Sequence, residues 1–329
     1  MNLKEELLKT IAKLDGLNKV EDLIRTKLSS DAHLLEEIPE YLLDLGGKRM
    51  RPVLCLMIAK ALGNPVNEKL VQISAGIELI HMATLLHDDI IDNASLRRHK
   101  ISPYKKYGTA ATLLAGDFLL VRAFSLCAHL DEFIINETEK ACIELTEGEI
   151  LETPFYKQRH DLNSYLTIAD KKTASLFKLA TISAAHLSDC NPETVKTHRE
   201  FGINIGIAFQ ILDDILDITS NKNLLGKEIG TDLKEKKPSI INVLWLDSNS
   251  DLAKEVLLKE EQVSPENLKL AIEEIKNSEI IEKSKQLATK YANQSLDNLA
   301  TIKNNKLVKD EFAFSSLHKI VQYTLSRLG

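Results

Sequence analysis

The stretch EKLVQISAGIELIHMATLLHDDIID, residues 68–92, is apolar around almost its whole circumference if it is helical, and it ends in three aspartates. Its apolar residues recur at three- and four-residue intervals, which indicates an α-helix. The stretch FGINIGIAFQILDDILDI, residues 201–218, closes a second long helical segment of the same character. Because a helix that is apolar all round must be buried, we expect both helices at the centre of a bundle.

The same spacing continues through most of the chain, and we find no convincing alternating pattern of the kind that predicts strands. Helices are predicted over residues 3–28, 31–44, 52–62, 67–92, 109–130, 134–153, 161–187, 193–219 and 238–246, and over several segments between 250 and 327. No linker rich in Pro, Gly or Ser divides the 329 residues. We therefore expect an all-α fold and a single domain, 1–329.

The composition is that of an ordinary globular protein, with 44% hydrophobic and 27% charged residues. The net charge of -6 argues against a general nucleic-acid binder, whose surface would be basic. The four cysteines are widely spaced and form no CxxC pair, which favours reduced thiols over disulfides or zinc ligands. The N-terminus is unlike a signal peptide, and no stretch is expected to span a bilayer. These features predict a soluble, cytoplasmic protein.

Two acidic clusters occur inside the apolar helices. Both have the pattern Asp-Asp-x-x-Asp, with the first and last carboxylates on one helical face. The six residues are Asp88, Asp89, Asp92, Asp213, Asp214 and Asp217. Like charges at this spacing cost about 0.2 to 0.5 kcal/mol, and burying an unpaired ion costs several kcal/mol. A solvated helix end would explain one cluster, but two together favour a Mg²⁺ site that diphosphate oxygens complete.

Basic residues gather at three breaks beside helix ends. They are Lys48, Arg49 and Arg51 in the turn GGKRMRP, Arg97 and Arg98 after the first acidic cluster, and Lys227, Lys234, Lys236 and Lys237 in the loop GKEIGTDLKEKKPS. Each group alone is typical of a solvated surface. Their position favours phosphate binding, because arginine forks and N–H groups at helix ends suit phosphate oxygens. On this reasoning His81, Lys172 and Thr173 stay open, since a lone His or Lys on a helix is more often structural.

Six motifs in combination resemble those of the trans-isoprenyl diphosphate synthases. They are LGGKRMRP (45–52), LLHDDIIDNASLRR (85–98), AGDFLLVRAF (115–124), KTASLF (172–177), FQILDDILD (209–217) and GKEIGTDLKEKKPS (226–239). The medium- and long-chain members, such as octaprenyl and heptaprenyl diphosphate synthases, are the type that this chain resembles. The resemblance implies an isoprenoid-synthase bundle with a central cavity. It also implies condensation of isopentenyl diphosphate with an allylic diphosphate, such as farnesyl or geranylgeranyl diphosphate.

The resemblance further implies a role for each matched residue. Asp88, Asp92 and Asp213 would bind Mg²⁺, present as three ions with the diphosphate, supported by Asp89, Asp214 and Asp217. The allylic diphosphate would contact Arg97, Lys172, Lys227 and Lys237. Isopentenyl diphosphate would contact Lys48, Arg51, His81 and Arg98. The implied catalytic residues are Lys172, Thr173 and Gln210, of which the last two would direct oxygen dipoles at the allylic cation.

Product length is predicted from Ala83 and Thr84, about one turn before the first aspartate. Short-chain members of the family carry bulky aromatic residues there. Here both side chains are small and Gly76 would extend the open stripe, so we expect a hexaprenyl to octaprenyl product for quinone side chains. Close packing of a neighbouring helix is the other explanation for the small residues. Glu149, where short-chain members often carry Gln, fits a longer product, whereas His99, where Gly is frequent, has no explanation.

Several alternatives stay open. The family implies a homodimer and allows peripheral membrane contact through the product. A geranylgeranyl diphosphate synthase, the catalytic subunit of a heteromeric synthase and a regulatory partner subunit are also compatible with the sequence. An HD-type phosphohydrolase using His81 and His87 would leave the second cluster unexplained. A di-iron protein would need a second copy of Glu78-x-x-His81, and a terpene cyclase would not need the second diphosphate site.

Overall fold

The structure is a computed structural model, and it describes residues 3–12, 14–220 and 229–326. Within these ranges the elements are helices and one small hairpin, which confirms the predicted all-α fold. The helices of the first half are α1 (Leu3–Ala12), α2 (Leu17–Leu28), α3 (His33–Asp44), α4 (Met50–Ala61), α5 (Glu68–Ile91), α6 (Pro103–Tyr107), α7 (Thr109–Cys127) and α8 (Glu132–Leu151). Those of the second half are α9 (Leu162–Ala169), η1 (Asp170–Ala174), α10 (Ser175–His186), α11 (Pro192–Thr219), α13 (Thr231–Lys234), α14 (Ile240–Asp247), α15 (Asp251–Leu258), α16 (Pro265–Lys276), α17 (Ile280–Asn304) and α18 (Glu311–Ser326).

Three local features differ from the prediction. The helix predicted over 3–28 is divided before α2, because Gly16 adopts a φ of 90° that helical residues do not have. The helix predicted over 161–187 contains the π-helical turn η1. The prediction of no strands is wrong where β1 (Leu96–Arg97) pairs with β2 (Lys100–Ile101). Arg98 and His99 have φ values of 51° and 68°, and two positive values in succession form a two-residue hairpin turn.

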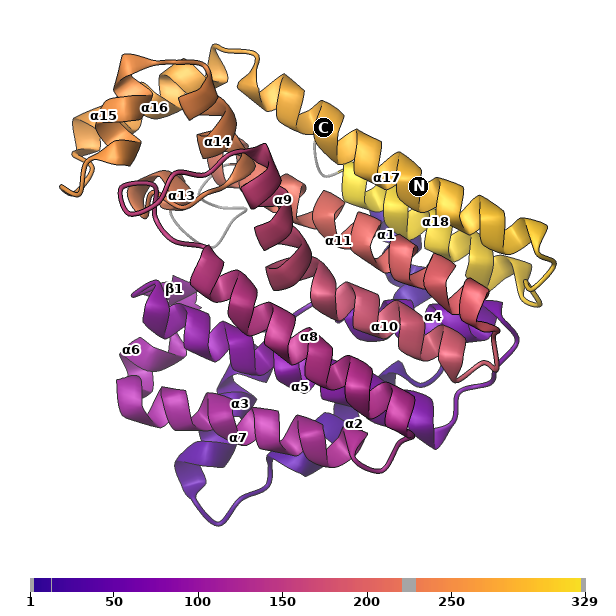
Figure 1. Cartoon of the computed structure of the whole chain (residues 1–329). Helices are drawn as coiled ribbons and strands as arrows, with labels where there is room; N and C mark the ends of the chain where they lie inside the picture. Colours follow the sequence, from indigo (N-terminus) through magenta and orange to yellow (C-terminus); the bar gives the residue numbers. More distant parts are fainter. Residues whose placement is uncertain (1–2, 13, 221–228, 327–329) are drawn as a thin grey trace.

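The two apolar helices lie at the centre of the bundle, as their sequence predicts. Helix α5 packs against α7, α4 and α2, and α11 lies between α10 and α17 (Figure 1). Nearly every face of α5 is buried along most of its length; at its acidic end Asp89 is buried, and Asp88 and Asp92 are half-buried. The acidic end of α11 is buried in the same way.

Glycines fix the place of η1 between two long helices. A side-chain carbon at Gly148 of α8 would lie 2.6 Å from the backbone nitrogen of Lys172. A side-chain carbon at Gly206 of α11 would lie 2.5 Å from the Cα atom of Ala174. Only glycine leaves room for such close backbone contact. Helices α8 and α11 therefore contact η1 closely from two sides and set the position of Lys172.

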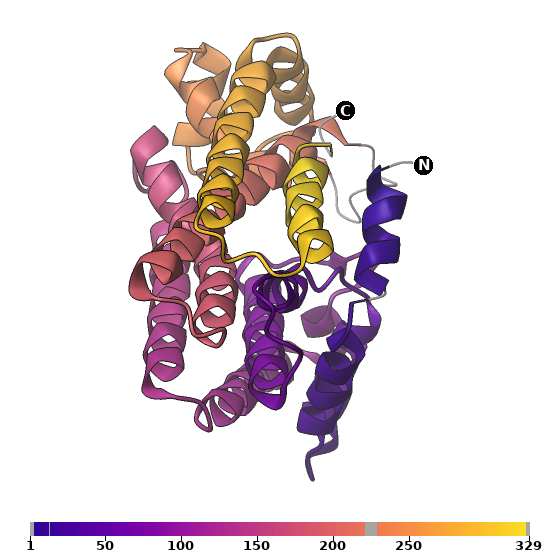
Figure 2. The same ribbon diagram turned by 90° about the vertical axis from the view of Figure 1, so that its right-hand side faces the viewer.

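The chain ends meet on one side of the molecule. Helix α1 packs along α18, with an ion pair between Glu6 and Lys319, and the two helices lie side by side in Figure 2. Helix α18 also packs on α4, which follows the GGKRMRP turn. The last helix of the chain thus supports the turn that carries Lys48 and Arg51.

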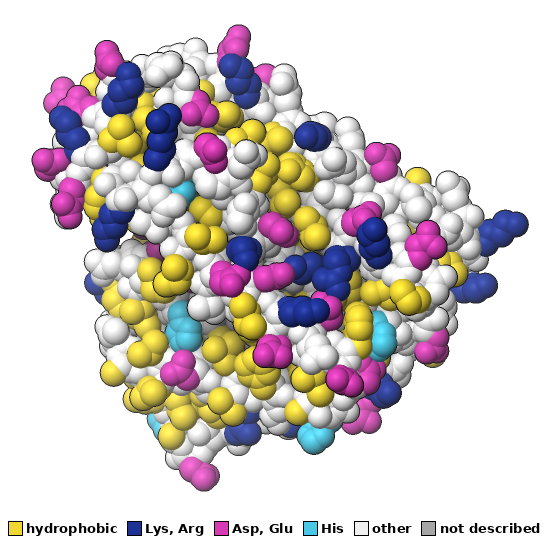
Figure 3. All heavy atoms as spheres, viewed as in Figure 1, with side chains coloured by type: hydrophobic (Ala, Val, Ile, Leu, Met, Phe, Trp, Pro, Cys, Tyr) yellow, Lys and Arg dark blue, Asp and Glu magenta, His cyan; other side chains and the backbone are white. Residues whose placement is uncertain are grey.

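The expectation that no stretch could span a bilayer is wrong by length and composition, because α5 and α7 both meet that criterion. In α5, 72% of the apolar window is buried inside the protein, so it is a core helix. In α7 only 39% is buried. One or two such helices are weak evidence of a membrane span, since core helices of soluble proteins pass the same test. Figure 3 shows hydrophobic side chains gathered on the lower part of one face, over α7 and α8.

Candidate active site

A pocket of about 1000 Å³ lies between the central helices, η1 and the segment 231–239. This cavity agrees with the one that the family resemblance implies. The structure brings most of the predicted site residues together in its lining. They are Arg51, His81, Thr84, Asp88, Asp92, Arg97, Arg98, Lys172, Thr173, Gln210, Asp213, Asp214 and Lys237.

The two acidic clusters approach the pocket from different helices. Asp88 and Asp92 share a face at the end of α5, and Asp213 and Asp214 come from α11. Burial raises the pKa of Asp88 to about 7; Lys172 opposes this shift, and neighbouring carboxylates add to it. Burial likewise raises the pKa of Asp214 to about 7. Both carboxyls are therefore held where their negative charge is costly unless a cation arrives.

The middle aspartate of the first cluster does not line the pocket. Asp89 is fully buried, and the Arg97 Nε atom lies 2.8 Å from both of its carboxylate oxygens. The Arg97 Nη2 atom approaches Asp89 Oδ1 to 2.6 Å. Asp89 therefore fixes the guanidinium of Arg97 beside the pocket.

The last aspartate of the second cluster is also outside the pocket lining. Asp217 is buried, and its Oδ2 atom accepts a hydrogen bond of 3.2 Å from the backbone N–H of Asp232. Its backbone oxygen accepts a second bond, of 2.9 Å, from the N–H of Gly230. Asp217 thus anchors the start of the 231–239 segment to α11.

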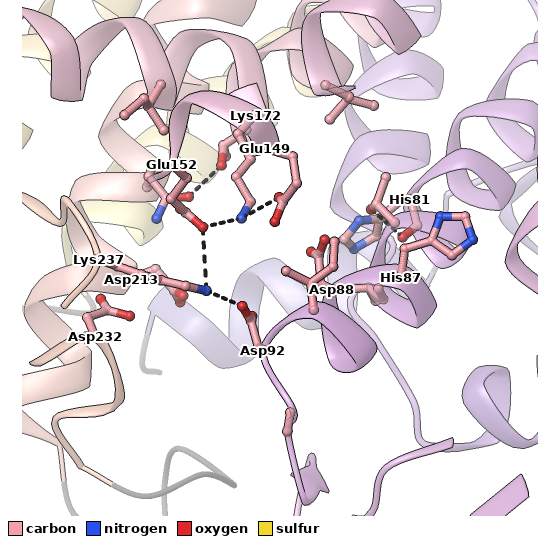
Figure 4. Close-up of a pocket in the computed structure, with 18 of the residues that line it drawn as sticks. His81, His87, Asp88, Asp92, Glu149, Glu152, Lys172, Asp213, Asp232 and Lys237 are labelled. Carbon is pink, nitrogen blue, oxygen red and sulfur yellow. Dashed lines mark hydrogen bonds and ion pairs between the residues drawn. The ribbon is translucent and has the colours of Figure 1, made fainter. Parts of the chain in front are cut away.

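A chain of ion pairs joins the lysines of the pocket to its carboxylates (Figure 4). The Lys172 Nζ atom lies 2.7 Å from Glu149 Oε2 and 2.6 Å from Glu152 Oε2. The Lys237 Nζ atom lies 3.4 Å from the same Glu152 oxygen and 2.5 Å from Asp92 Oδ1. Burial lowers the pKa of each lysine, but Glu152 and its acidic neighbours more than offset this and hold both pKa values above the usual range. Both lysines therefore stay charged, and both are held by Glu152 at the pocket.

A polar network connects η1 to the second acidic cluster. The Thr173 hydroxyl donates a hydrogen bond to Gln210 Oε1. Gln210 Nε2 donates to Asp214 Oδ1 at 2.7 Å, and the backbone N–H of Ile240 donates to Asp214 Oδ2 at 2.9 Å. A π-helical turn is rare and is often found at functional sites. Here it turns Thr173 toward α11, so the orientation of Gln210 is set from both of its ends.

A second group of cations forms another part of the lining. Burial lowers the pKa of Arg51 to about 10, and it also lowers the pKa of Arg98. The guanidinium carbon of Arg51 lies 4.8 Å from the centre of the Phe177 ring, a cation–π contact. His81 is half-buried, and desolvation together with the nearby arginines lowers its pKa well below the usual range. This wall therefore presents two guanidiniums and a neutral imidazole to a ligand.

Other predicted cations lie elsewhere. The Lys48 Nζ atom donates to the Tyr323 hydroxyl at 2.8 Å and sits 5.0 Å from the ring centre, outside the pocket lining. Lys234 lines the pocket, whereas Lys236 is buried and donates to backbone oxygens of Lys259 and Glu261. Lys227 lies outside the described residues.

The residues expected to set product length divide into two groups. Thr84 lines the pocket, as predicted. Ala83 is fully buried and is not part of the lining. A side-chain carbon at Gly76 would lie 3.0 Å from the Cys127 sulfur, so this glycine allows α5 and α7 to pack closely. The predicted open stripe therefore does not continue to Gly76, where close packing is the correct explanation.

Sequence reasoning missed two paired acids, the half-buried Glu152 and the buried Glu78. Glu152, which joins the two lysines, follows Glu149 by three residues and could have been found as a second acid on the same helical side. Glu78 was considered only as part of a di-iron motif, yet its carboxylate pairs with Arg49 at 3.1 Å. Neither pairing can be read from spacing, because each partner lies on a different element.

The sequence profile of the Polyprenyl synthetase family matches residues 32–275. The all-trans-nonaprenyl-diphosphate synthase (geranyl-diphosphate specific) of Rhodobacter capsulatus is 37% identical over 242 residues, which are 73% of this chain and 74% of that protein. The geranylgeranyl diphosphate synthase of Sulfolobus acidocaldarius is 31% identical over 324 residues, 94% of this chain and 96% of that protein. A polyprenyl synthase of Caulobacter crescentus, solved with calcium and isoprenyl diphosphate, has a TM-score of 0.90 at 28% identity, covering 99% of this chain and 98% of that one.

The fold and the pocket, taken with these similarities, define an all-α enzyme of the isoprenoid synthase class. The chain belongs to the polyprenyl synthetase family, which confirms the resemblance found in its motifs. It is a trans-prenyltransferase that makes prenyl diphosphates.

Proposed function

We propose that this enzyme adds isopentenyl diphosphate repeatedly to farnesyl or geranylgeranyl diphosphate and releases a trans-polyprenyl diphosphate of hexaprenyl to octaprenyl length. The observation that supports this best is that one pocket holds two separate sets of anion-binding groups. One set is the lysines beside the two acidic clusters, and the other is the arginine wall with His81. Two diphosphate substrates require two such sets.

A divalent cation fits the acidic set. Among the described residues no three His, Cys, Asp or Glu side chains form a preformed metal cluster. Carboxylates that approach from two helices, without gathering, suit Mg²⁺, which takes one or two of them and several phosphate oxygens. We propose Asp88, Asp92 and Asp213 as the residues that hold it, with three ions per bound diphosphate. When bound, Mg²⁺ would neutralise charge on the leaving diphosphate.

The other residues of the pocket then have distinct tasks. Lys172, Lys237 and Arg97 would hold the allylic diphosphate, and Arg51, Arg98 and His81 would hold isopentenyl diphosphate. Thr173 and Gln210 would direct their oxygen atoms at the allylic cation, in the orientation that Asp214 fixes. Lys48 would have to leave Tyr323 before it could contact a substrate.

Product length is tested with purified protein, Mg²⁺, an allylic primer and labelled isopentenyl diphosphate, with products resolved by chain length. Hexaprenyl to octaprenyl products support the proposal. Accumulation of geranylgeranyl diphosphate alone would favour the short-chain alternative. No product, with fully folded protein, would favour a heteromeric enzyme or a regulatory subunit.

A pair of adjacent variants locates the path of the growing chain. Thr84→Phe should shorten the product and leave the first condensations intact, because Thr84 lines the pocket. Ala83→Phe should instead cost about 1 to 3 kcal/mol of stability, since its site is fully packed. An active Thr84→Phe enzyme with products of unchanged length would contradict this path.

We also propose that the enzyme is a homodimer whose second copy covers α7 and α8. Apolar side chains are exposed along both helices, and a large apolar patch marks an interaction surface. They are Leu113, Leu114, Val121, Phe124, Ile135, Ile143 and Ile150. Light scattering should give twice the mass of the chain, and Val121→Glu should reduce it. A monomeric wild-type protein that binds vesicles would favour membrane contact through this face.

A further inference from the structure

Glu78 is a buried acid to which the proposed reaction gives no task. It is 3% exposed, in the middle of α5, one helical turn before His81. Its Oε1 atom lies 3.1 Å from Arg49 Nη1, and the Arg49 side chain is itself 8% exposed. A buried ion pair has to recover the cost of removing both charges from water, and substitution by apolar residues is often neutral or stabilising. A contribution to stability therefore does not by itself explain why the Glu78–Arg49 ion pair is present.

Three arginines interact with the single negative charge of Glu78. A side-chain carbon at Gly47 would lie 2.5 Å from Arg49 Nη1 and 3.2 Å from Arg98 Nη1, so both guanidiniums rest against this glycine. Arg51 is also half-buried here, and the charge of Glu78 partly restores the pKa values of Arg51 and Arg98 that desolvation lowers. The Arg51 Nε atom has no hydrogen-bond partner among the described residues.

The side chains of Arg49 and Arg51 point in different directions, although the two residues are only two positions apart. Arg51 lines the pocket, whereas Arg49 does not. Arg49 has a φ of 48° at the start of α4, and its guanidinium points back to Glu78 and to the backbone oxygen of Leu43, which is 3.4 Å away. Glu78 therefore ties down the turn from which Arg51 reaches the pocket.

We propose that Glu78 is a positioning residue for the isopentenyl diphosphate site. Its carboxylate holds Arg49 out of the pocket and supplies the negative charge beside which Arg51 and Arg98 stay packed before substrate arrives. This inference rests on the proposed function, because it assumes that these two arginines hold isopentenyl diphosphate.

The experiment compares Glu78→Gln with Glu21→Gln by steady-state kinetics, with each substrate varied in turn. Glu21 is the matched control because it also contacts Arg49, at 3.4 Å, but is half-exposed. Glu78→Gln should raise the KM of isopentenyl diphosphate by about tenfold or more, as expected when buried charged groups lose a partner. The KM of the allylic substrate should change less than about threefold, and Glu21→Gln should resemble the wild type in both constants.

The double variant Arg49→Met with Glu78→Met separates positioning from stability, and it serves if Glu78→Gln fails to fold. It removes both charges and keeps the volume, so the melting temperature should return toward that of the wild type. The KM of isopentenyl diphosphate should stay high, because Arg51 and Arg98 still lack a counter-charge.

Two outcomes would overturn the inference. One is an equal rise of both Michaelis constants in Glu78→Gln, and the other is a double variant with the wild-type KM for isopentenyl diphosphate. The wild-type enzyme serves as the control for the proposed function. If it does not consume isopentenyl diphosphate, the proposed function fails, whereas turnover without the expected split between the variants refutes the role of Glu78 alone.

Discussion

The two aspartate clusters share one sequence pattern, but their neighbours are of different kinds. In the first cluster, Asp89 binds the guanidinium of Arg97 and Asp92 binds the ammonium of Lys237. In the second, Asp214 accepts hydrogen bonds from neutral groups, the side chain of Gln210 and the backbone N–H of Ile240. Asp89 and Asp92 of the first cluster are thus held by cations, whereas Asp214 of the second is held by dipoles that have fixed directions.

Within each Asp-Asp-x-x-Asp cluster the first and second aspartates have different neighbours. In each cluster the first aspartate faces the pocket, and the second has a neighbour that it orients. Asp89 is turned about 100° round the helix from Asp88, which takes it from the pocket face to the side of Arg97. In our proposal the first aspartates, together with Asp92, are therefore the metal ligands, and the second aspartates act through Arg97 and Gln210.

The largest effect should come from removing a first aspartate. Asp88→Ala and Asp213→Ala should each lower kcat by at least about a thousandfold, because a catalytic metal ion contributes several kcal/mol. The fold should persist, and the melting temperature without Mg²⁺ should not fall, since crowded negative charge is relieved. Circular dichroism measures the fold and the melting temperature, and steady-state turnover at saturating Mg²⁺ measures kcat.

Asp15→Ala is the control for these variants, because Asp15 forms only an exposed ion pair of 3.6 Å with Lys60 among the contacts described. Its kcat should equal that of the wild type. Near-normal turnover in either active-site variant at saturating Mg²⁺ would disprove the metal assignment, and normal turnover in Asp213→Ala alone would break the symmetry between the clusters.

Sequence patterns predicted the helices and the clusters because both depend on residues close together in the chain. The apolar spacing of α5 and α11 placed these helices at the centre, and the four-residue interval placed Asp88 and Asp92 on one face. The family resemblance added Lys172 and Gln210, which spacing alone had left unassigned.

Contacts between distant elements could not be predicted. Lys48 lies against Tyr323, 275 residues further along the chain, because α18 packs on α4. The sequence predicts that Gly76 extends an open stripe, but it does not show that Cys127 of α7 occupies the space beside it. Spacing along one helix gives the face on which a residue lies, whereas the neighbour that covers that face comes from another part of the chain.

A second, smaller effect concerns the pH dependence of stability without metal. Folding raises the pKa of Asp88 and of Asp214 to about 7, from about 3.9 in the unfolded chain. A raised acid pKa means that the folded state binds a proton more tightly, so this contribution to stability is complete below about pH 4 and is lost as the pH rises to about 7. Within that interval each carboxyl should lower the free energy of unfolding by up to about 1.4 kcal/mol for each unit that the pH rises.

The test compares variants, because His81 and His198 have lowered pKa values and change stability in the opposite direction. Urea unfolding of the metal-free protein at several pH values gives the free energy of unfolding. Relative to the wild type, Asp88→Asn and Asp214→Asn should each become more stable as the pH rises from about 5 to about 7. A difference that does not vary with pH would mean that these carboxyls are charged throughout, and would remove the electrostatic likeness of the two clusters.

The smallest effect should distinguish the two second aspartates from each other. Asp89→Asn leaves Arg97 beside a neutral amide, so the guanidinium is less firmly held at the pocket, and the KM of the allylic substrate should rise about tenfold with little change in kcat. In Asp214→Asn one of the two oxygens that accept from Gln210 and Ile240 becomes an NH₂ donor, so one of these two hydrogen bonds is lost. Gln210 should then lose its fixed direction, and kcat should fall about tenfold with little change in KM. Steady-state kinetics with the allylic substrate varied measures this split. If both variants altered the same constant, the cation beside Asp89 and the dipoles beside Asp214 would have the same task, and the different neighbours of these two aspartates would have no bearing on catalysis.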